Sequence, residues 1–178
     1  MKMKNLNDLF MMELRDMYGA EKMVLKALPK MAKAASAEPL KAALQQHLKE
    51  TERQIERLEK VFSQAGAPAR AKKCKGMQGV LEEGQEIMEE DAEPSVRDAG
   101  LIGAAQRVEH YEMAGYGCLR TYARLLGNEQ AARLFEETLG EEKHADLKLT
   151  ELAERGINLQ ARDAGEEEEE DNRQRKAA

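Results

Sequence analysis

The stretch LIGAAQRVEHYEMAGYGCLRTYARLLGN, residues 101–128, decides the fold of this chain. Within it, positions at alternating steps of four and three are apolar or small, which is the spacing of one face of an α-helix. They are Leu101, Ala105, Val108, Gly115, Leu119, Tyr122 and Leu126. The one exception is Glu112. Gly127-Asn128 follows as a helix-ending pair, because glycine readily takes the left-handed conformation that closes helices. We therefore expect a long helix with an acid inside its packing face.

Three other segments show the same periodicity. The first helix is predicted over residues 6–33, with Asn5 or Asn7 as its N-cap and Glu21 in its apolar face. The second is predicted over residues 40–64. The last follows Asn128 and is expected to run to about residue 155, where Gly156 closes it.

The connection between the second and third long helices is more than 25 residues long. It spans residues 67–97, and its apolar spacing predicts one short amphipathic helix inside it. Two antiparallel helical hairpins joined by a long crossover describe an all-α, ferritin-like four-helix bundle. We expect this bundle to occupy residues 1–160 and residues 161–178 to form an acidic, disordered tail, since Glu166 to Asp171 are all acidic.

The two predicted hairpins also resemble each other. Glu21 corresponds to Glu112 and Glu50 to Glu141, and both pairs are 91 residues apart. This weak repeat predicts a pseudo-two-fold bundle in which the four acids meet near the axis.

The composition and net charge of the chain argue against several classes of function. The chain has 178 residues, of which 42% are hydrophobic and only 4% aromatic, and its formal net charge is −6. The negative charge argues against nucleic-acid binding, which needs a basic face. The sequence has neither a long apolar run nor a signal-peptide pattern, so we expect no membrane association. Two cysteines without a metal-binding spacing favour a cytoplasmic protein.

Acids inside apolar helix faces point to metal binding, because a buried charge must be paired, protonated or bound to a cation. Each predicted long helix offers one acid near its middle, namely Glu21, Glu50, Glu112 and Glu141, of which Glu50 is at the edge of its apolar face. His144 follows Glu141 by three residues, which places both on one helix face. A Glu on two helices and a Glu-x-x-His on the other two is the di-metal carboxylate arrangement. Oxygen-rich ligands with one or two histidines favour Fe or Mn.

The second helix departs from this arrangement, because Arg53 stands where the second histidine is expected. His47, three residues before Glu50, and Gln54, four residues after it, are the alternative ligands. The third helix carries an additional acid, Glu109, one turn before Glu112. Glu142 rather than Glu141 is an alternative inward-facing acid on the last helix, because Phe135, Leu149 and Leu152 form a stripe that includes it.

Four segments resemble the YciE/YciF-type family of ferritin-like bacterial proteins: LRDMYGAEKMVLKALPKM, HLKETERQIERLE, VEHYEMAGYGCL and EETLGEEKHADLKLTELA. The resemblance covers roughly residues 4–160. It implies a ferritin-like fold, a stress response and a homodimer. The additional acid Glu109 is similar to the pattern in rubrerythrins, but this chain has no four-cysteine rubredoxin-like domain.

Two functions follow as hypotheses. In the first, two Fe or Mn ions per chain bind to Glu21, Glu50, Glu112, Glu141 and His144, with Glu109 and His47 as variable ligands, and react with oxygen or peroxide. In the second, the chain is a non-catalytic stress-associated bundle whose metal site has degenerated. An iron-storage or DNA-protecting cage is a third hypothesis, which the acidic tail disfavours.

Overall fold

The structure, a computed structural model, describes residues 3–165, which contain helices and connecting segments but no strand. Within this range five α-helices follow one another: α1 (Leu6–Ala34), α2 (Glu38–Gln64), α3 (Lys75–Glu89), α4 (Pro94–Leu125) and α5 (Glu129–Leu152). The prediction of an all-helical chain is therefore confirmed. Residues 166–171, the acidic block of the predicted tail, lie outside the described residues.

The end of the last helix differs from the prediction. A π-helical turn, Ala153–Ile157, follows α5, and helical backbone continues to Gly165. Gly156 does not have the positive φ of a helix-ending glycine, which in residues 3–165 occurs only at Gly66 and Gly127. Buried Ala153 and Ile157 pack into the same hydrophobic cluster as Leu149, so the chain gains apolar contacts by continuing past Gly156.

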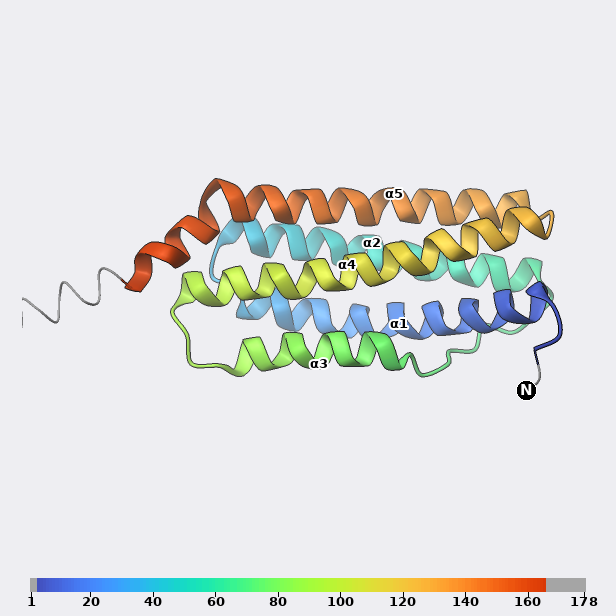
Figure 1. The fold of residues 1–178 in the computed structure, drawn as a ribbon, viewed down its shortest axis with the longest axis horizontal. Coiled ribbons are helices and arrows are strands. Elements are labelled where there is room, and N and C mark those ends of the chain that lie inside the picture. Colours follow the sequence, from blue (N-terminus) through green and yellow to red (C-terminus); the bar gives the residue numbers. More distant parts are fainter. Residues whose placement is uncertain (1–2, 166–178) are drawn as a thin grey trace, which may run out of the picture.

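The four long helices lie side by side, and α3 lies along α1 and α4 (Figure 1). The colours of Figure 1 show that α1 and α5 run in one direction and that α2 and α4 run in the other. Within this arrangement α1 packs on α2 and on α4, while α5 packs on α4 and on α2. Each long helix thus turns one face to a common interior.

The helix ends are capped by the residues expected from the sequence and by one that is distant in it. The Asn5 side chain accepts a hydrogen bond from the Asp8 amide, and Asn128 accepts one from the Ala131 amide. The turn between α1 and α2 uses Asp98 of α4 instead. Its buried carboxylate accepts hydrogen bonds from the amides of Ser36 (2.8 Å) and Ala37 (2.7 Å).

The hydrophobic core is divided into two clusters. One contains Phe10, Leu14, Leu58, Leu119 and Phe135 and fills the half of the molecule near the α4–α5 turn. The other contains Val24, Leu28, Leu44, Leu101 and Leu149 and fills the half near the α1–α2 turn. Buried polar side chains at mid-helix lie between the two clusters. The fold therefore places a polar layer across the middle of an otherwise apolar interior.

Gly19 is the point at which the crossover lies directly on α1. The Lys72 amide donates a hydrogen bond to the Arg15 carbonyl (2.9 Å), and a Cβ at Gly19 would overlap the Lys72 carbonyl oxygen. Because backbone must move, we expect Gly19→Ala to lower the free energy of unfolding by about 1–3 kcal/mol despite alanine's higher helix propensity. Urea denaturation measures this change.

Gly117 of α4 is the matched control, because a Cβ there meets open space. We expect Gly117→Ala to raise the free energy of unfolding by up to about 1 kcal/mol. Stabilisation by both alanines would show that the crossover is not held against α1.

Candidate metal centre

The polar layer receives side chains from all four long helices. Glu21 comes from α1, His47 from α2, Glu109 and Glu112 from α4, and Glu142 from α5. Glu21, Glu112 and Glu142 are 0% exposed, Glu109 is 1% and His47 is 4%. Charged residues are almost never buried this fully unless they are paired. The complete burial of four carboxyl groups therefore requires an explanation beyond ordinary packing.

Four of these side chains converge on one point. His47, Glu109, Glu112 and Glu142 each offer one nitrogen or oxygen atom within 4.8 Å of the others. His47 lies at the centre of the contacts. Its Nε2 is 3.3 Å from Glu109 Oε1, and its Nδ1 is 4.0 Å from Glu142 Oε2. The group thus has the size and the donor atoms of a cation site.

Most of the polar atoms in this layer lack a hydrogen-bond partner among residues 3–165. They are both oxygens of Glu112, both oxygens of Glu142, Oε2 of Glu21, Oε2 of Glu109 and both ring nitrogens of His47. Buried polar groups are nearly always hydrogen-bonded, and an unsatisfied one commonly indicates a missing ion or water. Here the unsatisfied atoms are grouped, as expected for ligands of a cation.

Glu21 lies beside the four converging residues and has one specific partner. The hydroxyl of buried Tyr116 donates a hydrogen bond to Glu21 Oε1. This bond fixes one carboxylate oxygen and leaves Oε2 unpaired. Tyr116 therefore orients Glu21 within the layer.

Burial changes the acidity of the whole group. It raises the pKa of Glu21 to about 7, against the opposing effect of the Tyr116 hydrogen bond. Burial, followed by repulsion from neighbouring carboxylates, raises the pKa of Glu112 and of Glu142 well above the ordinary value. Burial alone would lower the pKa of His47, but the nearby carboxylates of Glu109, Glu50 and Glu21 together raise it overall. Without a cation the layer therefore binds extra protons near neutral pH.

The two α5 residues that the sequence favoured as ligands lie outside this group. Glu141 forms an ion pair with Arg57 of α2, with Arg57 Nη1 2.6 Å from Glu141 Oε2, and its side chain is 20% exposed. His144 is exposed to solvent. Glu142, the alternative acid on this helix, is the one that points into the layer.

Of the α2 residues that the sequence offered as ligands, some lie in the converging group and others lie at its edge. His47, one of the alternatives for the second helix, is in the group, whereas the Gln54 side chain donates a hydrogen bond to Glu141 (3.1 Å). Glu50 lies at the edge, with Oε2 3.9 Å from His47 Nδ1. Arg53 is half exposed. Its Nη2 lies 3.7 Å from Glu50 Oε1 and 3.8 Å from Glu141 Oε1, so the side chain does not enter the group.

Sequence reasoning missed the role of Tyr116. The sequence pattern assigns no carboxylate partner to any tyrosine. Tyr18 donates to Glu59 (2.6 Å) and Tyr111 to Asp16 (3.4 Å), and both acids lie outside the polar layer. The available signal was spacing, because Tyr116 follows Glu112 by four residues on the same helix face.

Residues 5–162 match the protein family described as "Domain of unknown function (DUF892)". The chain belongs to this family. It is 48% identical to Protein YciF of Escherichia coli (strain K12) over 162 residues, which cover 90% of this chain and 98% of YciF. The resemblance to YciE/YciF-type proteins is thereby confirmed.

Solved structures agree with this assignment. The crystal structure of the E. coli stress protein YciF matches with a TM-score of 0.84 and 47% identity, over 88% of this chain and 99% of that one. YcfI from Rhodopseudomonas palustris matches with a TM-score of 0.81 and 41% identity, over 83% and 94%. A Xanthomonas campestris protein, 22% identical with a TM-score of 0.70 over 90% and 98%, shares the fold. Within residues 3–165, no helix is both long and apolar enough to cross a bilayer.

Proposed function

We propose that this chain is a ferritin-like protein that binds Fe or Mn in the polar layer and reacts with oxygen or peroxide during a stress response. The observation that carries the proposal is the set of buried, unpaired oxygen and nitrogen atoms from Glu109, Glu112, Glu142 and His47. The side-by-side arrangement of the four long helices is the architecture in which such centres occur. The stress-protein name of the YciF structure agrees with this role.

The donor atoms fit these metals. Carboxylate oxygens with one imidazole nitrogen suit Fe and Mn, whereas thiolates, which favour zinc and copper, do not take part. Glu21, Glu109, Glu112 and Glu142 together carry four negative charges when ionised, which two divalent cations neutralise. Glu50 at the edge would supply a further oxygen. This charge balance supports two ions per chain.

The protein's own residues would define how the centre works. The metal, when bound, supplies electron transfer and open positions for a small oxidant. The Tyr116 hydroxyl keeps Glu21 Oε1 in place, so that Oε2 alone is free to bind. Buried Arg57 holds the partly buried Glu141 at the edge of the layer and thereby keeps a fifth charge out of it. The two hydrophobic clusters keep bulk water away from both sides.

Metal content tests the proposal directly. The protein is purified without a metal-affinity step, stripped with chelator and reloaded anaerobically with Fe(II) or Mn(II), and the bound ions are counted per chain. We expect close to two. Retention of no ion by a folded protein would support instead the non-catalytic bundle, in which the buried acids stay protonated.

Metal removal is also expected to lower thermal stability. A ligand present at about 100 times its dissociation constant stabilises a protein by about 2.7 kcal/mol, which for a chain of this size raises Tm by about 5–10 °C per ion. Calorimetry of the Mn(II)-loaded protein with and without chelator measures this difference. Mg(II), which binds carboxylate sites weakly and prefers to keep its water, is the control and is expected to shift Tm much less. Equal Tm values with Mn(II) and with chelator would contradict the proposal.

A further inference from the structure

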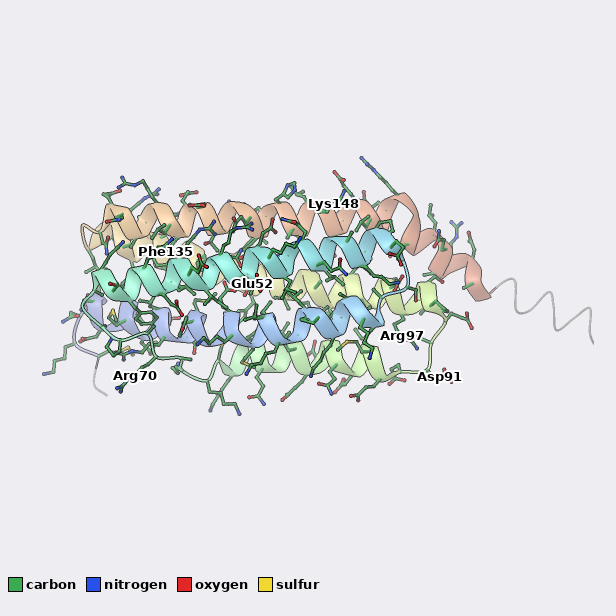
Figure 2. All side chains as sticks on the ribbon, turned by 180° about the vertical axis from the view of Figure 1, so that it is seen from behind. Glu52, Arg70, Asp91, Arg97, Phe135 and Lys148 are labelled. Atoms are coloured by element: carbon green, nitrogen blue, oxygen red, sulfur yellow. The ribbon has the colours of Figure 1, made fainter. Side chains whose placement is uncertain are left out.

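A cleft of about 560 Å³ lies between α2 and α5 and reaches the polar layer. Figure 2 shows these two helices side by side on the face turned to the viewer, with Lys148 labelled on α5. The volume falls within the range of sites that bind small molecules, roughly 300–1,000 Å³. Nothing in the proposed metal chemistry accounts for a cavity of this size, since oxygen and peroxide are far smaller.

The cleft is long, narrow and polar only in part. Its lining runs from Pro39 to Glu50 on α2 and from His144 to Leu152 on α5, which is about 12 Å along α5 at the helical rise of ~1.5 Å per residue. His47, Glu50 and Glu109 line the end near the middle of the molecule. Because α2 and α5 are antiparallel, Pro39 and Leu152 line the opposite end. Leu44 and Leu149 form the apolar floor between them.

Positive charge lies along one edge of this apolar floor. Lys148 lines the cleft from α5, one turn after His144, and both are exposed. Among residues 3–165 the Lys148 side chain has one ion-pair partner, Glu151, with 3.7 Å between Lys148 Nζ and Glu151 Oε2, and it is 50% exposed. Its ammonium group is therefore available to an anion at the edge. The acids Glu50 and Glu109 at the inner end would repel the same anion, which fixes its orientation.

The surroundings favour a small molecule over a protein partner. Exposed residues beside the cleft are mostly polar: Gln45, Gln46 and Lys49 on α2, and Lys143, His144, Lys148 and Glu151 on α5. A protein interface of stable size needs an apolar centre of several hundred Å² on each partner. Outside the cleft, Leu147 of α5 is the one large hydrophobic side chain of these two helices that is exposed (62%), and a single such residue does not supply a centre of that size.

We propose that the α2–α5 cleft binds a small molecule with an extended alkyl chain and one carboxylate. The chain lies over Leu44, Leu149 and Leu152, and the carboxylate pairs with Lys148. Because His47 and Glu109 form the inner wall, a bound molecule lies against the polar layer and restricts access of water to it. The inference does not depend on metal binding and is tested without metal.

Calorimetric titration with decanoate, below the concentration at which it forms micelles and in the presence of chelator, tests the proposal. We expect saturable binding of one molecule per chain. Octanoate, two methylene groups shorter, is expected to bind about 15-fold more weakly, since each buried methylene contributes a factor of about four. Absence of saturable binding, or equal affinity for both acids, would overturn the proposal.

Variants locate the site. Lys148→Glu is expected to weaken decanoate binding about fivefold, as loss of an exposed ion pair would. Lys143→Glu makes the same charge change on the same helix outside the cleft and is expected to have no effect, so equal weakening by both would contradict the proposed site.

Ala43→Trp, which fills the cleft, is expected to abolish binding. If Ala43→Trp instead splits a dimer, the cleft is an interface between copies and the proposal fails. Ion counts for Lys148→Glu should stay normal, so failure here leaves the metal proposal intact.

Discussion

Glu142→Gln is expected to weaken Mn(II) binding by more than about 100-fold. The reason is that Glu142 offers two unpaired, fully buried oxygens to the polar layer. Loss of residues that only support metal ligands already costs 10- to 100-fold in affinity, so loss of a ligand should cost more. Glutamine has the same shape without the charge, so the fold should persist. Competition with a fluorescent chelator measures the affinity.

Glu141→Gln is the matched control, one residue away on the same helix. Glu141 pairs with Arg57 at the edge of the polar layer and has no atom in the converging group. We expect its Mn(II) affinity to equal that of the unaltered protein. If Glu141→Gln lost the metal and Glu142→Gln kept it, the centre would be built as the spacing Glu141-x-x-His144 suggested and not as the polar layer indicates.

The second large effect is on the pH dependence of stability in the metal-free protein. Burial raises the pKa of Glu21 from 4.5 to about 7. The folded protein therefore holds a proton that the unfolded chain releases, so stability contributed by this proton is full below pH 4.5 and is lost as pH rises through 7. For Glu21 the loss is on the order of 3 kcal/mol, at about 1.4 kcal/mol per pH unit. Glu112 and Glu142 add losses of the same sign.

Glu21→Gln isolates this contribution, because glutamine cannot ionise and can still accept the hydrogen bond from Tyr116. We expect the variant to be more stable than the unaltered protein at pH 8 by about 3 kcal/mol, and the difference to shrink towards pH 5. Urea denaturation at pH 5 and at pH 8, in the presence of chelator, measures the free energies of unfolding. Glu52→Gln, which changes an exposed acid on α2, should show no such trend. Parallel pH profiles for all three proteins would mean that Glu21 is not protonated in the folded state.

The helices could be predicted from the sequence because their apolar period extends over many turns. Glu21 and Glu112 were found in the same way, since each occupies a position of an otherwise apolar series and is 0% exposed in the structure. A position inside a long periodic series has little freedom, because rotating the helix to expose the acid would also expose its apolar neighbours.

The choice between Glu141 and Glu142 could not be made in this way. Adjacent residues on a helix differ by about 100° in direction, and the apolar positions of α5 allowed either acid to face inward. The ion pairs of Arg57 determine which of the two acids faces inward. It is bound by Glu141 and Glu137 across the α2–α5 contact, with Nη2 2.6 Å from Glu137 Oε1. A contact between residues 80 and 84 positions apart in the sequence leaves no trace in the periodicity of either helix.

Asp98 joins the first and second halves of the chain, and it is synthesised later than the turn that it caps. The amides of Ser36 and Ala37 find their acceptor 62 and 61 residues further along the sequence. Because synthesis proceeds from the N-terminus, both helices of the first hairpin are made before this carboxylate exists. Until α4 emerges, the α1–α2 turn has only water to satisfy its amides. The first hairpin of the nascent chain thus remains without its final cap until the start of α4, which carries Asp98, is available to it.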